Sequence, residues 1–293
     1  MLSILIPIYN YPIKSLLEGL GRCMDLIDID VEILCMEDGS EEFLKENSHY
    51  CAQTQGAVHS IAQTNRGRIS TRKALANKAK YPWLLFLDAD VELENNFFLK
   101  TYLPYLDGKY DAVYGGCSYQ DTKPNQNELL RWTYGKTYED ISAERRNKLL
   151  YKHIVSANFL IKKTVFLELS SQINSEGYGY DILFGSLMKA AKTKVLHIDN
   201  AAIHKGLDDN ETFLGKVEKA VETAFKLQKT GAVPYASSTL LNSFKRLKSY
   251  GLAPFIGIVF KALKKPLKQQ LLSKAPNVKL LQFYKLGYLC ALR

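Results

Sequence analysis

Two carboxylates separated by one small residue, Asp88-Ala89-Asp90, directly follow four apolar residues at 84–87. Such an apolar run is typical of a strand that is buried on both faces. In an open α/β sheet, ligands bind just beyond the carboxyl ends of the strands. Two acids at such an end could bind a hard divalent cation and the phosphates that it carries. They could equally end the strand and begin a turn, because a lone pair of acids at this spacing is common.

Polar residues also follow two other segments with strand character. Residues 3–8 are almost continuously aliphatic and lead into Tyr9-Asn10, and the apolar segment 31–36 ends at Glu37-Asp38. The carboxyl ends of parallel strands lie at one edge of a sheet, so these side chains should converge with the pair at 88–90 in one crevice. That convergence favours a binding site over three unrelated turns.

Strands and helices alternate along this part of the chain. A third strand is expected at 57–62, helices are expected over 12–25 and 69–79, and Ser40 should cap the helix that follows it. The alternation predicts an α/β fold that is Rossmann-like, with a mainly parallel central sheet flanked by helices. Beyond Asp90 the expected elements are strands at 111–116, 156–161 and 194–198, a polar flap over 119–150 and a helix over 182–191.

From Asp208 onward the pattern contains only helical spacing, over 211–229, 239–248 and 255–272. Many lysines lie here among Leu, Phe, Ile and Tyr, and a basic amphipathic helix suits an anionic membrane surface. A helical appendage packed on the domain, with its lysines in solvent, is an equally good interpretation. The sequence thus predicts a catalytic domain over 1–206 and a helical, basic C-terminal region over 207–293.

Composition narrows the classes of partner and compartment. The net charge of +9 indicates an anionic partner, but no nucleic-acid recognition motif is present. Five scattered cysteines without a C-x-x-C pair argue against a disulfide framework or a zinc ribbon and suit a reducing cytoplasm. The chain has no signal-peptide start and no apolar segment of the ~18 residues that a bilayer requires. We therefore expect a cytoplasmic protein, either soluble or peripheral at the inner membrane face.

Five motifs in this order resemble the family 2 glycosyltransferases of the GT-A fold: residues 3–10, residues 32–40, Asn65-Arg66-Gly67 with Arg72 five residues on, Asp88-Ala89-Asp90, and residues 176–181. The similarity covers roughly residues 2–206 and leaves the tail unmatched. It implies an inverting hexosyl- or N-acetylhexosaminyltransferase that moves a sugar from a nucleotide-diphosphate sugar, with UDP favoured, to an acceptor hydroxyl.

The resemblance also implies roles on the donor side. Pro7 and Tyr9 would line the base pocket, with the Tyr9 ring available for stacking. Asp38 matches the acid that accepts a hydrogen bond from the base, and Arg72 matches the arginine beside the base and phosphates. Arg72 could instead be an ordinary exposed charge on its helix. Asn158, after a strand, is a further candidate for contact with the donor sugar.

For the metal and the chemistry, the family pattern places Asp88 on the ribose side and Asp90 on a Mn²⁺ or Mg²⁺ ion. His204 is a third candidate ligand beside this pair, and an imidazole would favour Mn²⁺. Asp181 is the candidate for the base that takes the acceptor's proton, with Glu176 as a second choice. Tyr180 stands where the family usually has another acid. Asp181 could also serve only as a helix N-cap.

Two other functions are compatible with parts of the pattern. A nucleotidyltransferase would need a Gly-rich basic loop after the first strand, but Tyr9-Asn10-Tyr11-Pro12 contains neither Gly nor Lys. A non-catalytic scaffold that binds nucleotide sugars would not need the acids at 38, 88, 90 and 181. The basic tail suggests a saccharide or lipid-linked saccharide acceptor and a peripheral membrane contact, as in the biosynthesis of surface polysaccharide or glycolipid.

Overall fold

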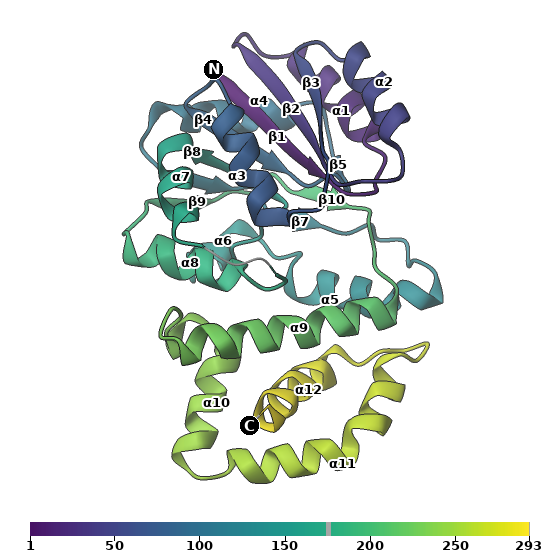
Figure 1. The fold of residues 1–293 in the computed structure, drawn as a ribbon, viewed down its shortest axis with the longest axis vertical. Coiled ribbons are helices and arrows are strands. Elements are labelled where there is room, and N and C mark those ends of the chain that lie inside the picture. Colours follow the sequence, from purple (N-terminus) through teal and green to yellow (C-terminus); the bar gives the residue numbers. More distant parts are fainter. Residues whose placement is uncertain (174–176, 293) are drawn as a thin grey trace. The chain divides into compact units, whose positions relative to one another are not determined.

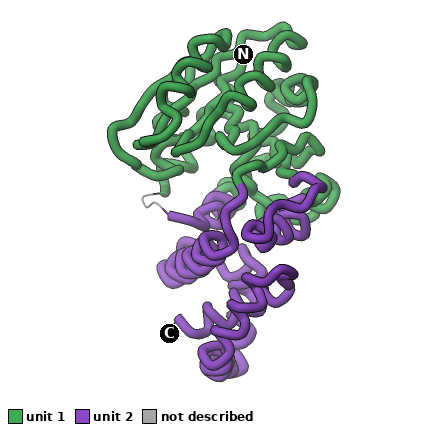
Figure 2. The backbone as a smooth tube through the Cα atoms, turned by 90° about the vertical axis from the view of Figure 1, so that its right-hand side faces the viewer, with its two compact units in different colours: residues 1–118, 141–176, 188–206 green, residues 119–140, 177–187, 207–293 purple. Residues whose placement is uncertain are grey.

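The computed structural model describes residues 1–173 and 177–292, and the chain forms two compact units. Unit 1 consists of residues 1–118, 141–176 and 188–206, and unit 2 consists of residues 119–140, 177–187 and 207–293 (Figure 2). The chain therefore enters unit 2 twice before its final passage at 206/207. The predicted division into domains over 1–206 and 207–293 remains a prediction.

Unit 1 is built on a seven-stranded sheet in the order β3-β2-β1-β4-β8-β6-β9. All of these strands except β6 are labelled in Figure 1. Only β8 runs antiparallel to its neighbours β4 and β6, which confirms a mainly parallel sheet. The strands are β1 (Leu2–Ile8), β2 (Val31–Asp38), β3 (Ala57–Ala62), β4 (Trp83–Leu87), β6 (Ala112–Tyr114), β8 (Asn158–Lys162) and β9 (Val195–His197).

The central strands of this sheet are buried because their side chains are apolar on both faces. All five residues of β4 are buried, and α1 covers the sheet with the expected stripe of Leu16, Leu17 and Leu20. The helices of unit 1 are α1 (Lys14–Met24), α2 (Leu44–Gln53), α3 (Arg68–Lys78), α4 (Phe98–Tyr102), α6 (Ala143–Asn147) and α7 (Lys163–Ser171), with a 3₁₀ turn at Leu103–Asp107.

A second, three-stranded sheet follows the acidic pair. Its order is β5-β10-β7, with β5 (Val91–Leu93) antiparallel to β10 (Ala202–His204) and β10 parallel to β7 (Cys117–Ser118). In this register His204 lies opposite Val91, the residue after Asp90. The small sheet thus connects two segments that are more than a hundred residues apart in the chain.

Two expectations about local structure were wrong. Residues 119–150 are not a flap: they contain α5 (Leu129–Tyr138) and α6, because Leu130 belongs to the core of unit 2 and Arg146 is buried in unit 1. Ser40 does not cap α2, which begins at Leu44. The Ser40 hydroxyl instead accepts a hydrogen bond from the Asn10 N–H and donates one to Glu37.

Unit 2 is helical, and its long helices pack around Phe213, Phe260, Leu281 and Tyr284. Its last helix was not predicted from the sequence, although Asn277 caps it by accepting from two backbone N–H groups. The helices are α5, the start of α8 (Asp181–Ala190), α9 (Asn210–Lys229), α10 (Thr239–Ser249), α11 (Ala253–Leu271) and α12 (Val278–Ala291), with 3₁₀ turns at Gln126–Glu128 and Tyr235–Ser237 (Figure 1). Among the described helices, none has an apolar stretch long enough to span a membrane.

Candidate active site

Three of the predicted donor-side residues, Tyr9, Asp38 and Asp88, lie at the ends of three adjacent parallel strands. The order β2-β1-β4 and a register that pairs Ile8 with Glu37 bring the ends of these strands to one edge of the sheet. Tyr9, Asp38 and Asp88 are therefore neighbours at this edge, as expected from the sequence. Pro7 is partly buried within β1, and Tyr9 beyond it leaves 56% of its surface exposed.

Asp38 fastens the loop after β3 to the end of β2. The Asp38 Oδ1 atom accepts from the Arg66 N–H and Oδ2 from the Gly67 N–H, both at 2.9 Å. The turn after Asp38 requires glycine, because Gly39 has a φ of +70° and a Cβ there would lie 2.3 Å from the Asn65 nitrogen. A carboxylate oxygen has two lone pairs, so each oxygen of Asp38 can still accept a bond from a ligand.

The loop after β1 is held to the loop after β2 through Asn10. The Asn10 side chain accepts hydrogen bonds from the backbone N–H groups of Glu41 and Glu42, at 2.8 and 3.2 Å. Below them, the fully buried Glu37 accepts from Asn47 and Ser40 at 2.8 and 2.6 Å. These bonds make Glu37 a structural anchor of the two loops, whereas Tyr9 remains exposed.

Asp88 is bound by two arginines from α3. Arg72 is buried and donates to Asp88 Oδ1 at 2.5 Å and to the Ser156 carbonyl oxygen at 2.8 Å. Arg68 lies 3.6 Å from Asp88 Oδ2, and 54% of its side chain is exposed. Arg72 is therefore not the ordinary exposed helix charge that its alternative interpretation supposed. It holds Asp88, whereas Arg68 presents a positive charge to solvent beside the acidic pair.

Asp90 contacts His204 through the pairing of β5 with β10. The His204 Nε2 atom lies 3.3 Å from Asp90 Oδ2. Burial by itself would raise the pKa of Asp90, but the hydrogen bond and charge of His204, together with the charge of Arg68, outweigh it and lower the pKa. Asp90 is thus an ionised carboxylate that contacts an imidazole at the edge where the strands end.

These residues fit a divalent cation in part. Within the described part of the chain, no three His, Cys, Asp or Glu side chains are arranged around a common metal position. Two arginines bind the Asp88 carboxylate, and its role as a metal ligand beside Asp90 and His204 remains a prediction. The buried Oδ1 of Asp90, however, has no hydrogen-bond partner among the described residues. One carboxylate and one imidazole suit a cation that takes its other ligands from a diphosphate and water.

Replacing Gly206 by Ala tests the position of the Asp90 carboxylate. A Cβ at residue 206 would lie 2.6 Å from Asp90 Oδ2, so the carboxylate must move. We expect Gly206→Ala to weaken Mn²⁺-dependent UDP binding about tenfold, with little change in melting temperature, because the displaced group is a single side chain. Gly215→Ala is the matched control, since a Cβ there meets nothing within 4 Å. Equal UDP affinity in both variants, measured by calorimetry, would contradict this prediction.

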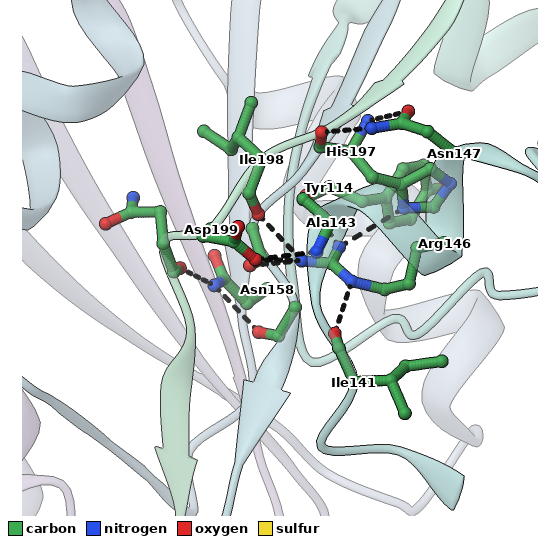
Figure 3. Close-up of polar contacts among 12 residues, drawn as sticks. Tyr114, Ile141, Ala143, Arg146, Asn147, Asn158, His197, Ile198 and Asp199 are labelled. Carbon is green, nitrogen blue, oxygen red and sulfur yellow. Dashed lines mark hydrogen bonds and ion pairs between the residues drawn. The ribbon is translucent and has the colours of Figure 1, made fainter.

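Asn158 and Arg146 form a buried polar cluster beside the site (Figure 3). Both N–H groups of the Asn158 amide donate hydrogen bonds, to the carbonyl oxygens of Gly116 and Asn200 at 3.0 and 2.8 Å. The Arg146 guanidinium donates to four carbonyl oxygens, those of Ile141, Tyr114, Gly115 and Ile198. The Asn158 bonds fix the chain just before β10, the strand that carries His204. This geometry favours a positioning role for Asn158, and its contact with a donor sugar remains a prediction.

His197 in the same cluster makes stability depend on pH. Its Nδ1 atom lies 3.2 Å from Arg146 Nη1, which can only donate, and its Nε2 atom lies 2.9 Å from the Leu150 carbonyl oxygen. The ring is therefore neutral, and burial with the nearby Arg146 charge lowers the pKa of His197 to about 4.

An unfolded histidine titrates near 6.5, so between about pH 6.5 and 4 the unfolded chain binds the extra proton. We expect the free energy of unfolding to fall across this window as pH decreases, by about 3 kcal/mol from this group. Urea titrations of the wild type and of His197→Gln at several pH values measure it. A pH dependence of equal size in His197→Gln would assign the loss to other groups.

Asp181 is exposed and is the first residue of α8, in unit 2. The chain reaches it through Gly177 and Gly179, both with positive φ, and a Cβ at Gly179 would lie 3.0 Å from the Ala220 Cα in α9. Glycine at 179 thus permits close packing on α9. The role of Asp181 as the base remains a prediction, and Glu176 lies outside the described residues.

Three residues that shape the site were not singled out from the sequence. Arg68 was visible only as one of several basic residues in its helix, and Arg146 only as a charge in a polar segment. Gly206 had no signal at all, because its importance comes from its proximity to Asp90. Each is defined by a contact with a residue far away in the chain.

The comparisons with known proteins concern the family and the fold. A sequence model described as Glycosyl transferase family 2 matches residues 3–169. No protein with a curated description matches the chain in sequence.

Solved structures that share the fold include S. aureus TarS 1-349 in complex with UDP-GlcNAc, at 14% identity and a TM-score of 0.52, covering 75% of this chain and 65% of that one. Glucosyl-3-phosphoglycerate synthase from Mycobacterium tuberculosis, in complex with Mn²⁺, UDP and glucosyl-3-phosphoglycerate, matches at 15% identity and a TM-score of 0.53, covering 80% of this chain and 81% of that one. The chain thus spans less than two thirds of the TarS chain.

Proposed function

The chain belongs to glycosyl transferase family 2 and has the GT-A fold with a helical C-terminal region, and from this premise we propose that it is an inverting glycosyltransferase. It transfers a hexosyl or N-acetylhexosaminyl group from a UDP-sugar to an acceptor hydroxyl. The observation that carries the proposal is the gathering of Asp38, Asp88 and Asp90 at the ends of adjacent strands, with His204 on Asp90.

The donor side of the site supports a uracil nucleotide. The exposed Tyr9 ring offers a stacking surface, and Asp38 retains acceptor capacity for the N3–H of uracil. Arg68, beside Asp88, supplies a positive charge for the diphosphate. UDP or UDP-GlcNAc is also present in the solved structures of similar fold, although their low identity leaves the donor of this chain a proposal.

Asp90 and His204 would hold the divalent metal, and Mn²⁺ is favoured over Mg²⁺ because one ligand is an imidazole. When bound, the ion supplies positive charge to the diphosphate as it leaves. Asp88, held by Arg72, would contact the ribose, as the resemblance to the family implies.

For the transfer itself, the acceptor oxygen attacks the anomeric carbon on the face opposite the diphosphate. The bond from that carbon to the β-phosphate oxygen breaks, and UDP leaves with the electron pair. The acceptor's proton passes to the Asp181 carboxylate, which its position at the start of α8 leaves exposed. Inversion follows because the new bond forms on the face opposite the one that breaks.

We place the acceptor among saccharides, lipid-linked ones included, and the process in the assembly of surface polysaccharide or glycolipid on the cytoplasmic side of the membrane. The support is the basic helical region that follows the catalytic part, over 207–293. A peripheral contact with anionic lipid belongs to the same proposal.

Calorimetric titration of nucleotides tests the donor assignment. With Mn²⁺ present we expect UDP to bind at least about tenfold tighter than CDP, GDP or ADP. Uracil presents N3–H to Asp38, cytosine has no hydrogen at N3, and the larger purines present their N–H groups at other positions. EDTA should remove most of the affinity. UDP-glucose and UDP-GlcNAc hydrolysis then identifies the sugar. Equal affinity for all four nucleotides would overturn the assignment.

A further inference from the structure

The net positive charge of this protein comes from its C-terminal segment. Residues 223–293 contain 13 of the 39 Lys and Arg residues and none of the 30 Asp and Glu residues. This segment therefore carries +13, and the remainder of the chain carries −4. The net charge of +9 therefore does not describe the catalytic part of the chain. It points to an anionic partner for the helices α10 to α12.

Exposed apolar side chains gather where α10 meets α11. Tyr250, Phe255 and Ile258 leave 74%, 63% and 68% of their surfaces exposed, and Leu252 lies between them in the turn. Phe255 and Ile258 are three residues apart on α11, so they project from the same face of this helix. A contiguous exposed group of this kind marks an interaction site, whereas single exposed apolar residues do not.

This face of α11 remains uncovered although the opposite face is fully packed. Phe260 lies 5.0 Å from the Tyr284 ring of α12, and a Cβ at Gly257 would lie 2.8 Å from the Cys290 carbonyl oxygen. The buried residues of α11 thus already fill the contact with α12. Phe255 and Ile258 point away from it, so the helix has two apolar faces and only one of them has a partner among the described residues.

The lysines of α11 also lie on two sides of the helix, one packed against the protein and one exposed. Lys264 and Lys268 face α9, with ion pairs to Glu218 and Glu211 at 3.1 and 3.9 Å. Lys261 and Lys265 lie on the exposed side beside Ile258 and make no ion pair with any residue that the structure describes. Their charges border the exposed apolar group and are not neutralised by the protein.

We propose that this corner surface, formed by Tyr250, Leu252, Phe255 and Ile258 with Lys261 and Lys265, docks onto a lipid bilayer with anionic headgroups. The apolar side chains enter the boundary between headgroups and acyl chains, and the lysines bind the headgroup phosphates. A second copy of the chain would bring two strongly cationic surfaces together, and nucleic acid would not require the apolar group. The inference deepens the proposed membrane-side function, but its test does not depend on catalysis.

Flotation of the full chain with vesicles tests the proposal directly. Vesicles of phosphatidylcholine mixed with phosphatidylglycerol should bind the protein, vesicles of phosphatidylcholine alone should bind it weakly, and added salt should release it. We expect Phe255→Ser/Ile258→Ser and Lys261→Glu/Lys265→Glu each to reduce the partition coefficient at least about tenfold.

Matched controls use residues of similar exposure in unit 1. Phe97→Ser/Ile61→Ser removes side chains that are 59% and 57% exposed, and Lys45→Glu/Lys100→Glu reverses two exposed lysines. These variants should partition like the wild type. If all four double variants bind vesicles equally, or if the wild type self-associates or binds RNA in preference to vesicles, the proposal is overturned. UDP titration of the same samples reports separately on the donor site, so failure of one proposal is distinguishable from failure of the other.

Discussion

Replacing Asp90 by Asn is expected to reduce the Mn²⁺-dependent affinity for UDP at least about a hundredfold, to the level found in EDTA. Asn preserves the size of the side chain and can still accept the contact with His204, but it removes the negative charge that would hold the cation. Because burial and neighbouring charges leave the carboxylate with a lowered pKa, wild-type Asp90 is charged throughout the neutral range. Calorimetry with UDP, with and without Mn²⁺, measures the effect.

The fold should survive this change, since Asn keeps the size of the Asp90 side chain and its contact with His204, and residue 90 lies at the sheet edge. We expect the melting temperature to shift by no more than about 3 °C. Asp28→Asn is the control, as an exposed acid in the loop that precedes β2, at the opposite edge of the sheet. Unchanged metal-dependent affinity in Asp90→Asn would show that the cation, if one is used, binds elsewhere.

Replacing Asp181 by Asn is expected to lower kcat for sugar transfer about a thousandfold and to leave UDP affinity within about twofold of wild type. Asn cannot take the acceptor's proton, but it serves as well as Asp at the start of a helix. The substitution therefore separates a role in proton transfer from a role in beginning α8. Single-turnover transfer and UDP titration are the two measurements.

Two further variants make this result decisive. Asp121→Asn changes an exposed acid elsewhere in unit 2 and should transfer sugar at the wild-type rate. Glu176→Gln tests the second candidate for the base. Full activity in Asp181→Asn combined with loss in Glu176→Gln would move the base to Glu176, and full activity in both would remove the carboxylate mechanism.

The positions and ends of the donor-side strands could be inferred from the sequence because their signals are local. The apolar runs that became β1, β2 and β4 end at polar residues, and parallel pairing brings those ends to one edge whatever the details of the packing. The resemblance to family 2 rested on the same segments, and the family match over residues 3–169 confirms it. Short-range patterns thus determined the location of the donor-side residues.

The contacts within that site could not be inferred in this way. Asp88 forms an ion pair with Arg72, and the contact of His204 with Asp90 depends on two strands of three residues each. Strands of this length have no readable period, and an ion pair between distant residues leaves no local signal. Both depend on which segments the tertiary structure brings together.

The C-terminal region and the acidic pair at 88–90 also separate what the sequence determines from what the tertiary structure decides. The sequence by itself determined that residues beyond 208 are helical and basic, and that two acids follow a buried strand, because helical spacing, charge and apolar runs are properties of neighbouring residues. Only the tertiary structure decided which face of α11 is covered by α12 and which partner each acid takes. The physical reason is that burial and ion pairing depend on contacts between segments that are far apart in the sequence. The local pattern of residues does not show which of these segments meet in the folded chain.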